Sequence, residues 1–280
     1  MTTRRNFIKA TSAATALSMI SPFELFAMKK NKFIGIQLYT IREELKKDFE
    51  GTLKKIAKTG YNAVETAGYG DRKFYDFKPK EFKKYTKKIG LKAQSSHANV
   101  QLKNLDHMIE DTLEAGMEYL VQPFISKEKR KSIDDYKKLA EEFNKIGEKC
   151  SKSGLRFAYH NHAFEFEKMD GQIPYDVLLN NTEPNYVTMQ LDTYWMVYGG
   201  YNPLDYFNKY PGRFELLHIK DMDNTKKRES TEIGKGIIDF KEIFKATEKS
   251  GMKYYYLEQE SFKMPVFESL ALSYDYLKQF

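Results

Sequence analysis

Residues 152–162, with the sequence KSGLRFAYHNH, contain the pattern on which the fold prediction depends. The part up to Gly154 is typical of a helix end, because glycine readily adopts the left-handed conformation that closes a last helical turn. The apolar run that begins at Leu155 has the length and composition of a buried strand. Side chains alternate along a strand, so His160 and His162 are expected to point the same way at its end.

The same order of helix end, glycine and short apolar run occurs at five places along the chain. The five glycines are Gly60, Gly90, Gly116, Gly154 and Gly251. Lysine stands two residues before most of them, and a cation in the last turn suits the helix dipole. Units of about 30 residues are what a strand and a returning helix require. The sequence therefore predicts a chain that alternates strands and helices.

Eight apolar runs are predicted strands, at residues 33–39, 63–66, 92–97, 119–124, 156–160, 186–192, 215–220 and 254–258. Helical patterns lie between them, for example at 43–58, 134–152 and 240–249. Eight such units in about 250 residues favour an α/β fold that is a single (β/α)8 TIM barrel over an open doubly wound sheet. We find no glycine-rich dinucleotide fingerprint after the first strand and no linker, so 28–280 is predicted to be one catalytic domain.

The composition is that of an ordinary globular protein, with 280 residues, 41% hydrophobic and 30% charged. The net charge of +7 comes from scattered lysines, which are typical of solvated helix faces, so no nucleic-acid partner is predicted. The single cysteine, Cys150, excludes an internal disulfide and a cysteine zinc site.

Residues 1–27 contain charged, apolar and small residues in the sequence order that is typical of an export signal. Arg4 and Arg5 precede an apolar and small-residue run at 10–20, and the small residue Ala27 follows. The arginine pair resembles the twin-arginine type of signal, and the alternative is an amphipathic first helix of the fold. The run is too short to span a bilayer, so no stable membrane span is predicted. The expected location is the periplasm, either free or tethered by a retained signal.

Each predicted strand ends in polar side chains, and in a barrel of this kind the site lies at the carboxyl ends of the strands. In strand order these side chains are Gln37 and Tyr39, Glu65, His97, Gln122, His160 and His162, Gln190 and Asp192, His218 with Lys220 and Asp221, and Glu258 with Glu260. Imidazoles and carboxylates without cysteine suit one divalent ion such as Mn²⁺, Co²⁺, Zn²⁺ or Mg²⁺.

Asp192, His218 and Glu258 come from three successive predicted strands and are expected to be neighbours on the barrel rim. Each has an ordinary structural alternative. Asp192 can cap the helix that follows it, His218 can be a core histidine bonded to a backbone carbonyl, and Glu258 can pair with a lysine. The joint arrangement favours the metal site.

Four motifs resemble the xylose-isomerase-like TIM-barrel superfamily of sugar phosphate isomerases and epimerases. They are QLDTYW at 190–195 followed by a glycine pair at 199–200, LHIKD at 217–221, GKG at 234–236 and LEQE at 257–260. The resemblance covers essentially the whole chain after the signal. It implies a barrel with one divalent metal held from strands five to eight by Glu, Asp, His and Glu. Asp192, His218 and Glu258 match the last three of these.

Strand five departs from that pattern, since His160 stands where many members of the superfamily have a glutamate. His160 completes the predicted metal set with Asp192, His218 and Glu258, while His162 and Glu165 remain alternatives for this fourth ligand. A histidine at this position can also serve as a base near neutral pH.

The predicted chemistry is proton abstraction next to a carbonyl, with the metal stabilising an enediolate on an unphosphorylated sugar or keto-sugar. The predicted acid or base is Glu258, His160 or His162, and Lys220 is expected to stabilise the oxyanion. The predicted substrate-binding residues are Tyr39, Glu65, His97, Gln122, Trp195 and Glu260. Return of the proton gives isomerisation or epimerisation, and loss of a β-substituent gives elimination.

Export favours an unphosphorylated substrate, because phosphorylated sugars are mostly intracellular. Some relatives in the superfamily cleave 3-keto-glycosides by elimination, with an oxidoreductase partner that supplies the ketone, and this lyase is the alternative to an isomerase or epimerase. Two other functions are alternatives to these enzymes. A hydrolase of abasic DNA normally needs three metals and more ligands than this chain offers, and a non-catalytic sugar-binding barrel would need no exchangeable metal position.

Overall fold

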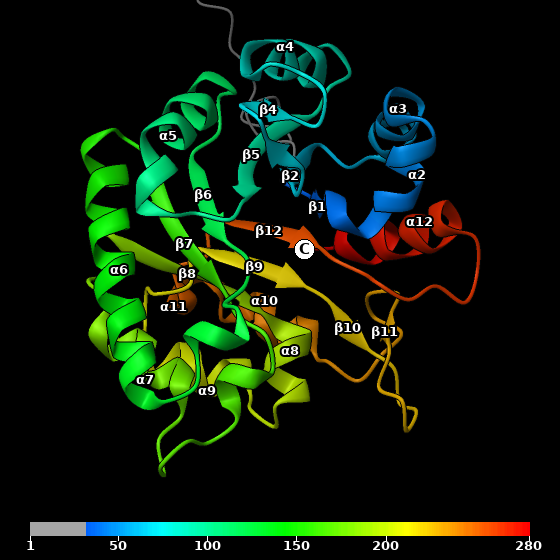
Figure 1. Ribbon diagram of the computed structural model, residues 1–280. Helices are drawn as coiled ribbons and strands as arrows, with labels where there is room; N and C mark the ends of the chain where they lie inside the picture. The colour runs from blue at the N-terminus through cyan, green and yellow to red at the C-terminus, as the bar shows by residue number, and fades with distance from the viewer. Residues whose placement is uncertain (1–31) are drawn as a thin grey trace, which may run out of the picture. The chain divides into compact units, whose positions relative to one another are not determined.

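The eight strands close into a parallel barrel with helices around it, as the ribbon of the computed structural model shows (Figure 1). The structure describes residues 32–280, so the predicted export signal lies outside the described residues. Neighbouring strands follow the order β1-β12-β9-β8-β7-β6-β5-β2, and residues 33–280 form one compact unit. The prediction of a (β/α)8 TIM barrel is confirmed.

Each predicted strand overlaps a strand of the barrel. The strands are β1 Gly35–Gln37, β2 Ala63–Thr66, β5 Lys92–His97, β6 Tyr119–Gln122, β7 Arg156–His160, β8 Val187–Asp192, β9 Leu216–Ile219 and β12 Tyr254–Leu257. Their register sets His160 beside Gln190 and Asp192 beside His218. The carboxyl ends of β7, β8 and β9 therefore lie side by side.

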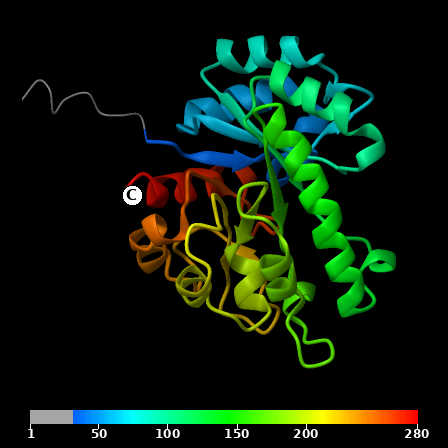
Figure 2. The ribbon, with the colours of Figure 1, turned by 90° about the vertical axis from the view of Figure 1, so that its left-hand side faces the viewer.

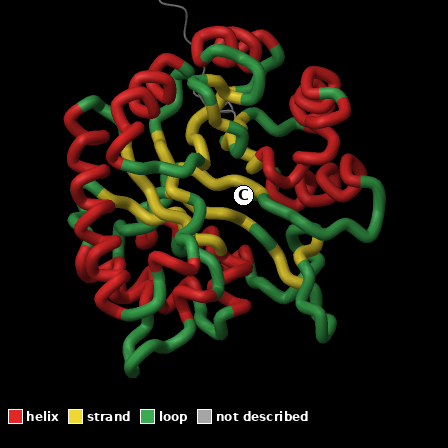
Figure 3. Tube along the Cα trace, viewed as in Figure 1, coloured by secondary structure: helices red, strands yellow, loops and turns green. Residues whose placement is uncertain are grey.

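Helices surround the strands, as Figure 3 shows in red around yellow. They are α2 Arg42–Lys47, α3 Phe49–Thr59, α4 Pro79–Lys88, α5 Leu105–Glu114, α6 Ile133–Lys152, α7 Pro174–Asn181, α8 Thr193–Tyr198, α9 Pro203–Lys209, α10 Phe240–Lys245, α11 Thr247–Ser250 and α12 Val266–Leu277. Figure 2 shows the long helix α6 running beside the barrel. Short 3₁₀ turns lie at η1 Leu38–Ile41, η2 Leu102–Asn104, η3 Lys127–Lys129 and η4 Phe164–Phe166. None of the helices within residues 32–280 is both long and apolar enough to cross a membrane.

Two of the predicted helices are divided in the structure. The one predicted at 43–58 breaks at Asp48, whose backbone is extended and whose carboxylate accepts the amide of Gly51 at 2.9 Å to cap α3. Aspartate is a favoured N-cap residue, and this local bond competes with a continuous helix. The one predicted at 240–249 breaks at Ala246. The prediction at 134–152 agrees with α6, which Ser132 caps.

All five glycines that were expected to close helices have positive φ. The values are 120° at Gly60, 80° at Gly90, Gly116 and Gly154, and 82° at Gly251. Each glycine leads the chain from a helix into a barrel strand, so this backbone position sets where each strand begins.

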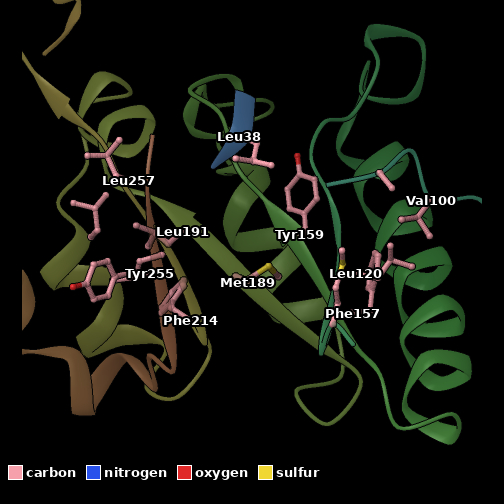
Figure 4. Packing of buried hydrophobic residues seen from close by; sticks show 14 of the residues in the cluster. Leu38, Val100, Leu120, Phe157, Tyr159, Met189, Leu191, Phe214, Tyr255 and Leu257 are labelled. Atoms are coloured by element: carbon pink, nitrogen blue, oxygen red, sulfur yellow. The ribbon is translucent and has the colours of Figure 1, made fainter. Parts of the chain in front are cut away.

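The interior of the barrel is divided into an apolar layer and a polar layer. Tyr119, Ala158, Leu216 and Tyr256 pack together within the strands. A larger apolar cluster fills the space between strands and helices, where Figure 4 shows buried side chains such as Leu120 and Phe157. Side chains alternate along each strand, so every second residue points into the barrel. The inward-facing residues nearer the carboxyl ends of the strands are polar and form the second layer.

Candidate functional site

Four side chains from neighbouring strand ends meet at the top of the barrel. His160 ends β7, Asp192 ends β8, His218 lies in β9 and Glu258 follows β12. One ligand atom from each lies within 4.8 Å of the others, and all four residues are buried. The structure thus brings together the four residues that the sequence predicts as metal ligands.

Each histidine of this cluster uses one ring nitrogen for a contact that leaves the other directed inward. His160 Nδ1 lies 3.3 Å from the carbonyl of Pro123, and its Nε2 lies 3.5 Å from Asp192 Oδ2. His218 Nε2 lies 2.6 Å from Glu65 Oε2, and its Nδ1 lies 3.8 Å from Asp192 Oδ2. A histidine whose outer nitrogen is bonded to a carboxylate or a carbonyl is the usual arrangement of a metal ligand.

Asp192 uses its two oxygens differently. Oδ1 accepts the amide hydrogen of Trp195 at 2.8 Å and so caps α8, which is the structural alternative raised from the sequence. Oδ2 is left facing the two histidines. The cap and a place in the cluster are therefore compatible.

Two buried atoms at the centre of the cluster, His160 Nε2 and Asp192 Oδ2, have no hydrogen-bond partner among residues 32–280. Beside them His218 Nδ1 lies 2.6 Å from Glu258 Oε2. Buried polar atoms in proteins are nearly always bonded, so two unbonded atoms that face each other beside this imidazole–carboxylate pair need a common explanation. Imidazole nitrogens and carboxylate oxygens are ligands of divalent ions such as Zn²⁺ and Mn²⁺. The donor set therefore fits one such ion.

The charges around the cluster keep Glu258 and Lys220 ionised, whereas burial raises the pKa of Asp192. Burial alone would raise the pKa of Glu258, but the charges of Lys220 and His218 outweigh it and hold that pKa well below its usual range. Burial alone would lower the pKa of Lys220, but the carboxylates of Glu258, Asp192 and Glu260 raise it above its usual value. The site therefore contains opposite charges within a largely buried space.

Glu65, predicted to bind substrate, lies below the cluster and is fully buried. Its carboxylate accepts hydrogen bonds from Gln37, Ser95 and Gln190 at 2.6–2.7 Å, and it lies 2.6 Å from His218. It also lies 3.0 Å from His97 Nε2. The structure thus differs from the prediction, because Glu65 orients His97 and His218 and has no exposed surface that a substrate could contact.

Gln122 also differs from its prediction as a substrate-binding residue. Its Oε1 accepts the amide of Val100 at 2.8 Å, and its Nε2 donates to the carbonyl of Phe124 at 2.6 Å. Both bonds go to backbone of loops that follow strands, so Gln122 holds these loops in place. Asp221 has a similar task, because it accepts backbone amides of the loop at 234–238.

A pocket of about 410 Å³, here called the central pocket, opens above the cluster. This volume is within the usual range of small-molecule sites. Its lining includes four predicted substrate-binding residues, Tyr39, His97, Trp195 and Glu260, together with His160, His162 and Glu258. The lining also includes Tyr69, Asn99, Pro123 and Phe124, which the sequence reasoning missed. Asn99 follows β5, Pro123 and Phe124 follow β6, and Tyr69 belongs to the short strand β3 Tyr69–Gly70 after β2. Their position just beyond the ends of barrel strands was the available signal.

His162 belongs to the aromatic wall of the central pocket. Its ring is stacked on Phe164 with centroids 5.6 Å apart and lies 5.4 Å from Trp195. Burial, with the charge of His160, lowers the pKa of His162 to about 3, which makes it a weak base at neutral pH. Glu165, the other alternative, is bonded to Tyr159 and to the amide of His162. His160 is thus the strand-five residue that reaches the cluster.

Lys220 lies between two carboxylates. Its ammonium group is 3.3 Å from Glu258 Oε1 and donates a hydrogen bond to Glu260. The rings of Trp195 and Tyr194 cover it at 4.9 and 5.1 Å from their centroids. The side chain is only 1% exposed, so its charge acts in an environment with little water.

Comparison with known proteins identifies the lineage of this barrel. A sugar phosphate isomerase/epimerase from Parabacteroides distasonis ATCC 8503 is 31% identical with a TM-score of 0.80, over 90% of this chain and 95% of that one. An inosose dehydratase from Lacticaseibacillus casei is 28% identical over 163 residues, 51% of this chain and 54% of that protein. The chain thus spans about half the length of the curated relatives it matches.

The structure of a zinc-bound IolI protein has a TM-score of 0.70 at 16% identity, over 89% of this chain and 97% of that one, which shows the common fold. Residues 53–279 match the family described as Xylose isomerase-like TIM barrel. This match covers most of the chain and agrees with the closed barrel and its rim. The protein therefore belongs to the xylose isomerase-like TIM barrel family.

Proposed function

We propose that this protein removes a proton next to the carbonyl of a keto-sugar or related polyhydroxy ketone, with a divalent ion held by His160, Asp192, His218 and Glu258. The observation that carries this proposal is the convergence of these four buried ligand groups below the central pocket. Two of their atoms, His160 Nε2 and Asp192 Oδ2, have no hydrogen-bond partner among the described residues. When bound, such an ion would polarise the carbonyl and stabilise the negative charge of the enediolate.

The protein side chains supply the remaining parts of the reaction. Glu258 is ionised and lines the pocket, so it can accept a proton, and Lys220 places a positive charge beside it. Tyr39 and Trp195 form walls against which a sugar ring can pack. His162 is better placed to shape the pocket, since its ring is stacked on Phe164 and lies against Trp195.

Isomerisation or epimerisation is the leading outcome, and it agrees with the solved relative that is a sugar phosphate isomerase/epimerase. Elimination is the second candidate and is supported by the similarity to inosose dehydratases, because a dehydratase removes water. Both reactions begin with loss of the same proton, so one experiment tests their common step. A barrel that only binds sugar would not exchange this proton.

The test is hydrogen exchange in D₂O. The purified protein, loaded with Mn²⁺, Co²⁺, Zn²⁺ or Mg²⁺, is incubated with keto-sugars and 3-keto-glycosides, and NMR follows deuterium at the carbon next to the carbonyl. We expect exchange or product with at least one ion, and its loss after chelation. Glu258→Gln should slow it by about a hundredfold or more.

The matched control is Glu141→Gln, since Glu141 is an exposed residue on α6. This variant should exchange at the wild-type rate. If the wild type shows neither exchange nor product with any ion, proton abstraction is wrong and the sugar-binding barrel becomes the better explanation.

We also propose that the protein is exported and receives its keto-sugar from a separate oxidoreductase. The twin-arginine-like residues Arg4 and Arg5 support the export. Replacement of both by lysine should move the protein from the periplasmic to the cytoplasmic fraction. An unchanged distribution would contradict export by this route.

A further inference from the structure

A short hairpin follows strand β2 at the mouth of the barrel, and residues 67–77 around it are here called the mouth hairpin. Its strands, β3 and β4 Lys73–Phe74, are antiparallel, with Tyr69 opposite Phe74. In the closed barrel, β2 is four strands away from β8 in either direction. Ala67 and Tyr69 line the central pocket. The mouth hairpin therefore supplies the wall of this pocket that lies across the barrel from the end of β8.

The turn of the mouth hairpin has a backbone that its own residues do not favour. Asp71 and Arg72 form this two-residue turn, with φ values of 48° and 59°. Two positive φ values suit the twist of a tight hairpin, but such turns usually contain glycine or asparagine, because a Cβ is crowded in this conformation. Residues in such a conformation persist where the surrounding structure holds them. Contacts made by the turn must therefore hold it in this form.

Asp111 of α5 holds the mouth hairpin from outside the central pocket. Its Oδ2 accepts hydrogen bonds from the Tyr69 hydroxyl at 2.7 Å and from Arg72 Nε at 3.1 Å. Its Oδ1 accepts a third bond from Arg72 Nη2 at 2.6 Å. The paired bonds of a guanidinium and a carboxylate fix direction as well as distance. One carboxylate, only 3% exposed, thus holds both the turn and a tyrosine that lines the pocket.

The ring of Tyr69 is fixed on its other side by aromatic packing. Tyr69 is half-buried, and its ring lies 5.0 Å from that of Phe74. Phe74 is fully buried and packs on Phe82 of the neighbouring helix α4 at 5.6 Å (Figure 1). Burial, with the hydrogen bond to Asp111, raises the pKa of Tyr69 above its usual value, so the hydroxyl keeps its proton and donates it. The position of this ring in the pocket wall is therefore set from outside the pocket.

We infer that Asp111 is a positioning residue that holds Tyr69 as the specificity-determining wall for the far end of the substrate. This inference rests on the proposed function and specifies its substrate as a keto-sugar long enough to cross the mouth of the barrel. The carbonyl end lies above the cluster, and the C–H face of the remaining carbons packs on the Tyr69 ring. A three-carbon ketone reaches the cluster but leaves this ring uncovered.

The test of Tyr69 compares a long ligand with a short one on the metal-loaded full chain. The long ligand is the keto-sugar of five or six carbons that exchanges fastest in D₂O, and the short one is dihydroxyacetone, measured as a competitor of that exchange. Tyr69→Ala should raise KM for the keto-sugar about tenfold, with kcat within about twofold and the Ki of dihydroxyacetone unchanged. Tyr69→Phe keeps the ring and should raise KM only about two- to threefold.

The test of Asp111 uses its neighbour Glu110 as a matched control. Both residues bind Arg72 Nη2 at 2.6 Å, but Glu110 is 67% exposed and makes no recorded bond to Tyr69. Asp111→Asn should raise KM for the keto-sugar about three- to fivefold, with kcat and the Ki of dihydroxyacetone unchanged. Amide hydrogen exchange, followed by mass spectrometry, should become faster in the mouth hairpin. Glu110→Gln should match the wild type in every one of these measurements.

A double variant tests whether Asp111 acts through Tyr69. Tyr69→Phe combined with Asp111→Asn should raise KM no more than Asp111→Asn alone, because both changes break the same bond. Circular dichroism and one bound ion per chain show that a variant is folded, and Tyr69→Phe, which removes a single oxygen, still decides the question if Asp111→Asn unfolds.

Four results would overturn the inference while wild-type deuterium exchange still supports the proposed function. They are an unchanged KM in Tyr69→Ala, an equal rise of KM and of the dihydroxyacetone Ki, additive effects in the double variant, and the same losses in Glu110→Gln. Absence of deuterium exchange in the wild type with every keto-sugar and every ion would overturn both.

Discussion

The two oxygens of Asp192 make it possible to separate a structural role from a ligand role within one residue. Oδ1 caps α8 through the amide of Trp195, whereas Oδ2 faces His160 and His218 without a bond within the described chain. Asparagine is as good an N-cap as aspartate but carries no charge. The two roles should therefore respond differently to substitution.

Asp192→Asn should lose the bound ion while the metal-free protein unfolds at nearly the wild-type denaturant concentration. Asp192→Ala should lose the ion and also about 1 kcal/mol of stability, because the cap is gone. Elemental analysis and urea unfolding of the metal-free proteins measure the two effects. One ion per chain retained in Asp192→Asn would contradict the assignment of Oδ2 as a ligand.

Glu165 is a buried carboxyl whose protonation should make stability depend on pH. Burial raises its pKa from the ordinary 4.5 to about 8. The unfolded chain releases this proton above pH 4.5, while the folded protein keeps it until about pH 8. Its favourable contribution is thus complete below pH 4.5 and is lost progressively between pH 4.5 and 8.

Glu165→Gln should therefore be about as stable as the wild type at pH 5 and more stable at pH 9, on the order of 1–3 kcal/mol. Glutamine keeps an oxygen that can accept the amide of His162 and a group that can donate to Tyr159. Urea unfolding at both pH values measures the difference, with the exposed Glu141→Gln as control. A difference that does not grow with pH would show that Glu165 is ionised in the folded protein.

At the scale of elements, two helix-closing glycines form a matched pair. Gly154 and Gly60 both have positive φ, at 80° and 120°, and both precede a barrel strand. A Cβ at Gly154 would meet no atom of the described residues within 4 Å, whereas a Cβ at Gly60 would collide with the ring of Tyr274. Both positions therefore carry a backbone cost for a residue with a Cβ, and Gly60 adds a steric one.

Gly154→Ala should lower the free energy of unfolding by about 1–2 kcal/mol, which is the conformational cost alone. Gly60→Ala should lower it further, because the ring of Tyr274 must also move. Denaturant unfolding of both variants measures this difference. Equal losses of unfolding free energy in the two variants would mean that α12, which carries Tyr274, shifts at this contact without an energetic cost.

The elements themselves were predictable to different degrees. Eight strands and the glycine caps have strong local patterns, since each apolar run is followed or preceded by a turn residue with a definite conformation. The break at Asp48 depends on one side-chain bond that competes with the helix, and the hairpin strands β3, β4, β10 Asp221–Met222 and β11 Ser230–Thr231 have two residues each. Strands so short have no periodicity to detect.

At the scale of the whole molecule, the barrel determines which inward-facing residue is accessible. Sequence alternation indicates that Glu65 and His218 both point inward, but it does not give their height along the barrel axis. The stagger of the strands sets that height, and it places Glu65 of β2 across the interior from His218 of β9, at 2.6 Å. Glu65, predicted from the sequence to bind substrate, therefore lies buried beneath the cluster and does not line the central pocket.

The four cluster residues come from four adjoining strands, β7, β8, β9 and β12, so a bound ion would tie together half of the barrel. A ligand that binds only the folded state stabilises it by an amount that grows with its concentration, about 2.7 kcal/mol at one hundred times Kd. The unfolded chain does not hold the four residues together. Removal of the ion should therefore lower the stability of the fold much more than the loss of one surface contact would.

Thermal unfolding across a series of Mn²⁺, Co²⁺ or Zn²⁺ concentrations checks this expectation. The wild-type Tm should rise by several degrees and keep rising with the logarithm of the ion concentration, because the binding free energy adds to the folding free energy. Asp192→Asn should show a flat curve, while Glu141→Gln should follow the wild type. A wild-type Tm that does not respond to any of these ions would mean that no divalent ion binds at the strand ends, and the unpartnered atoms there would need another explanation.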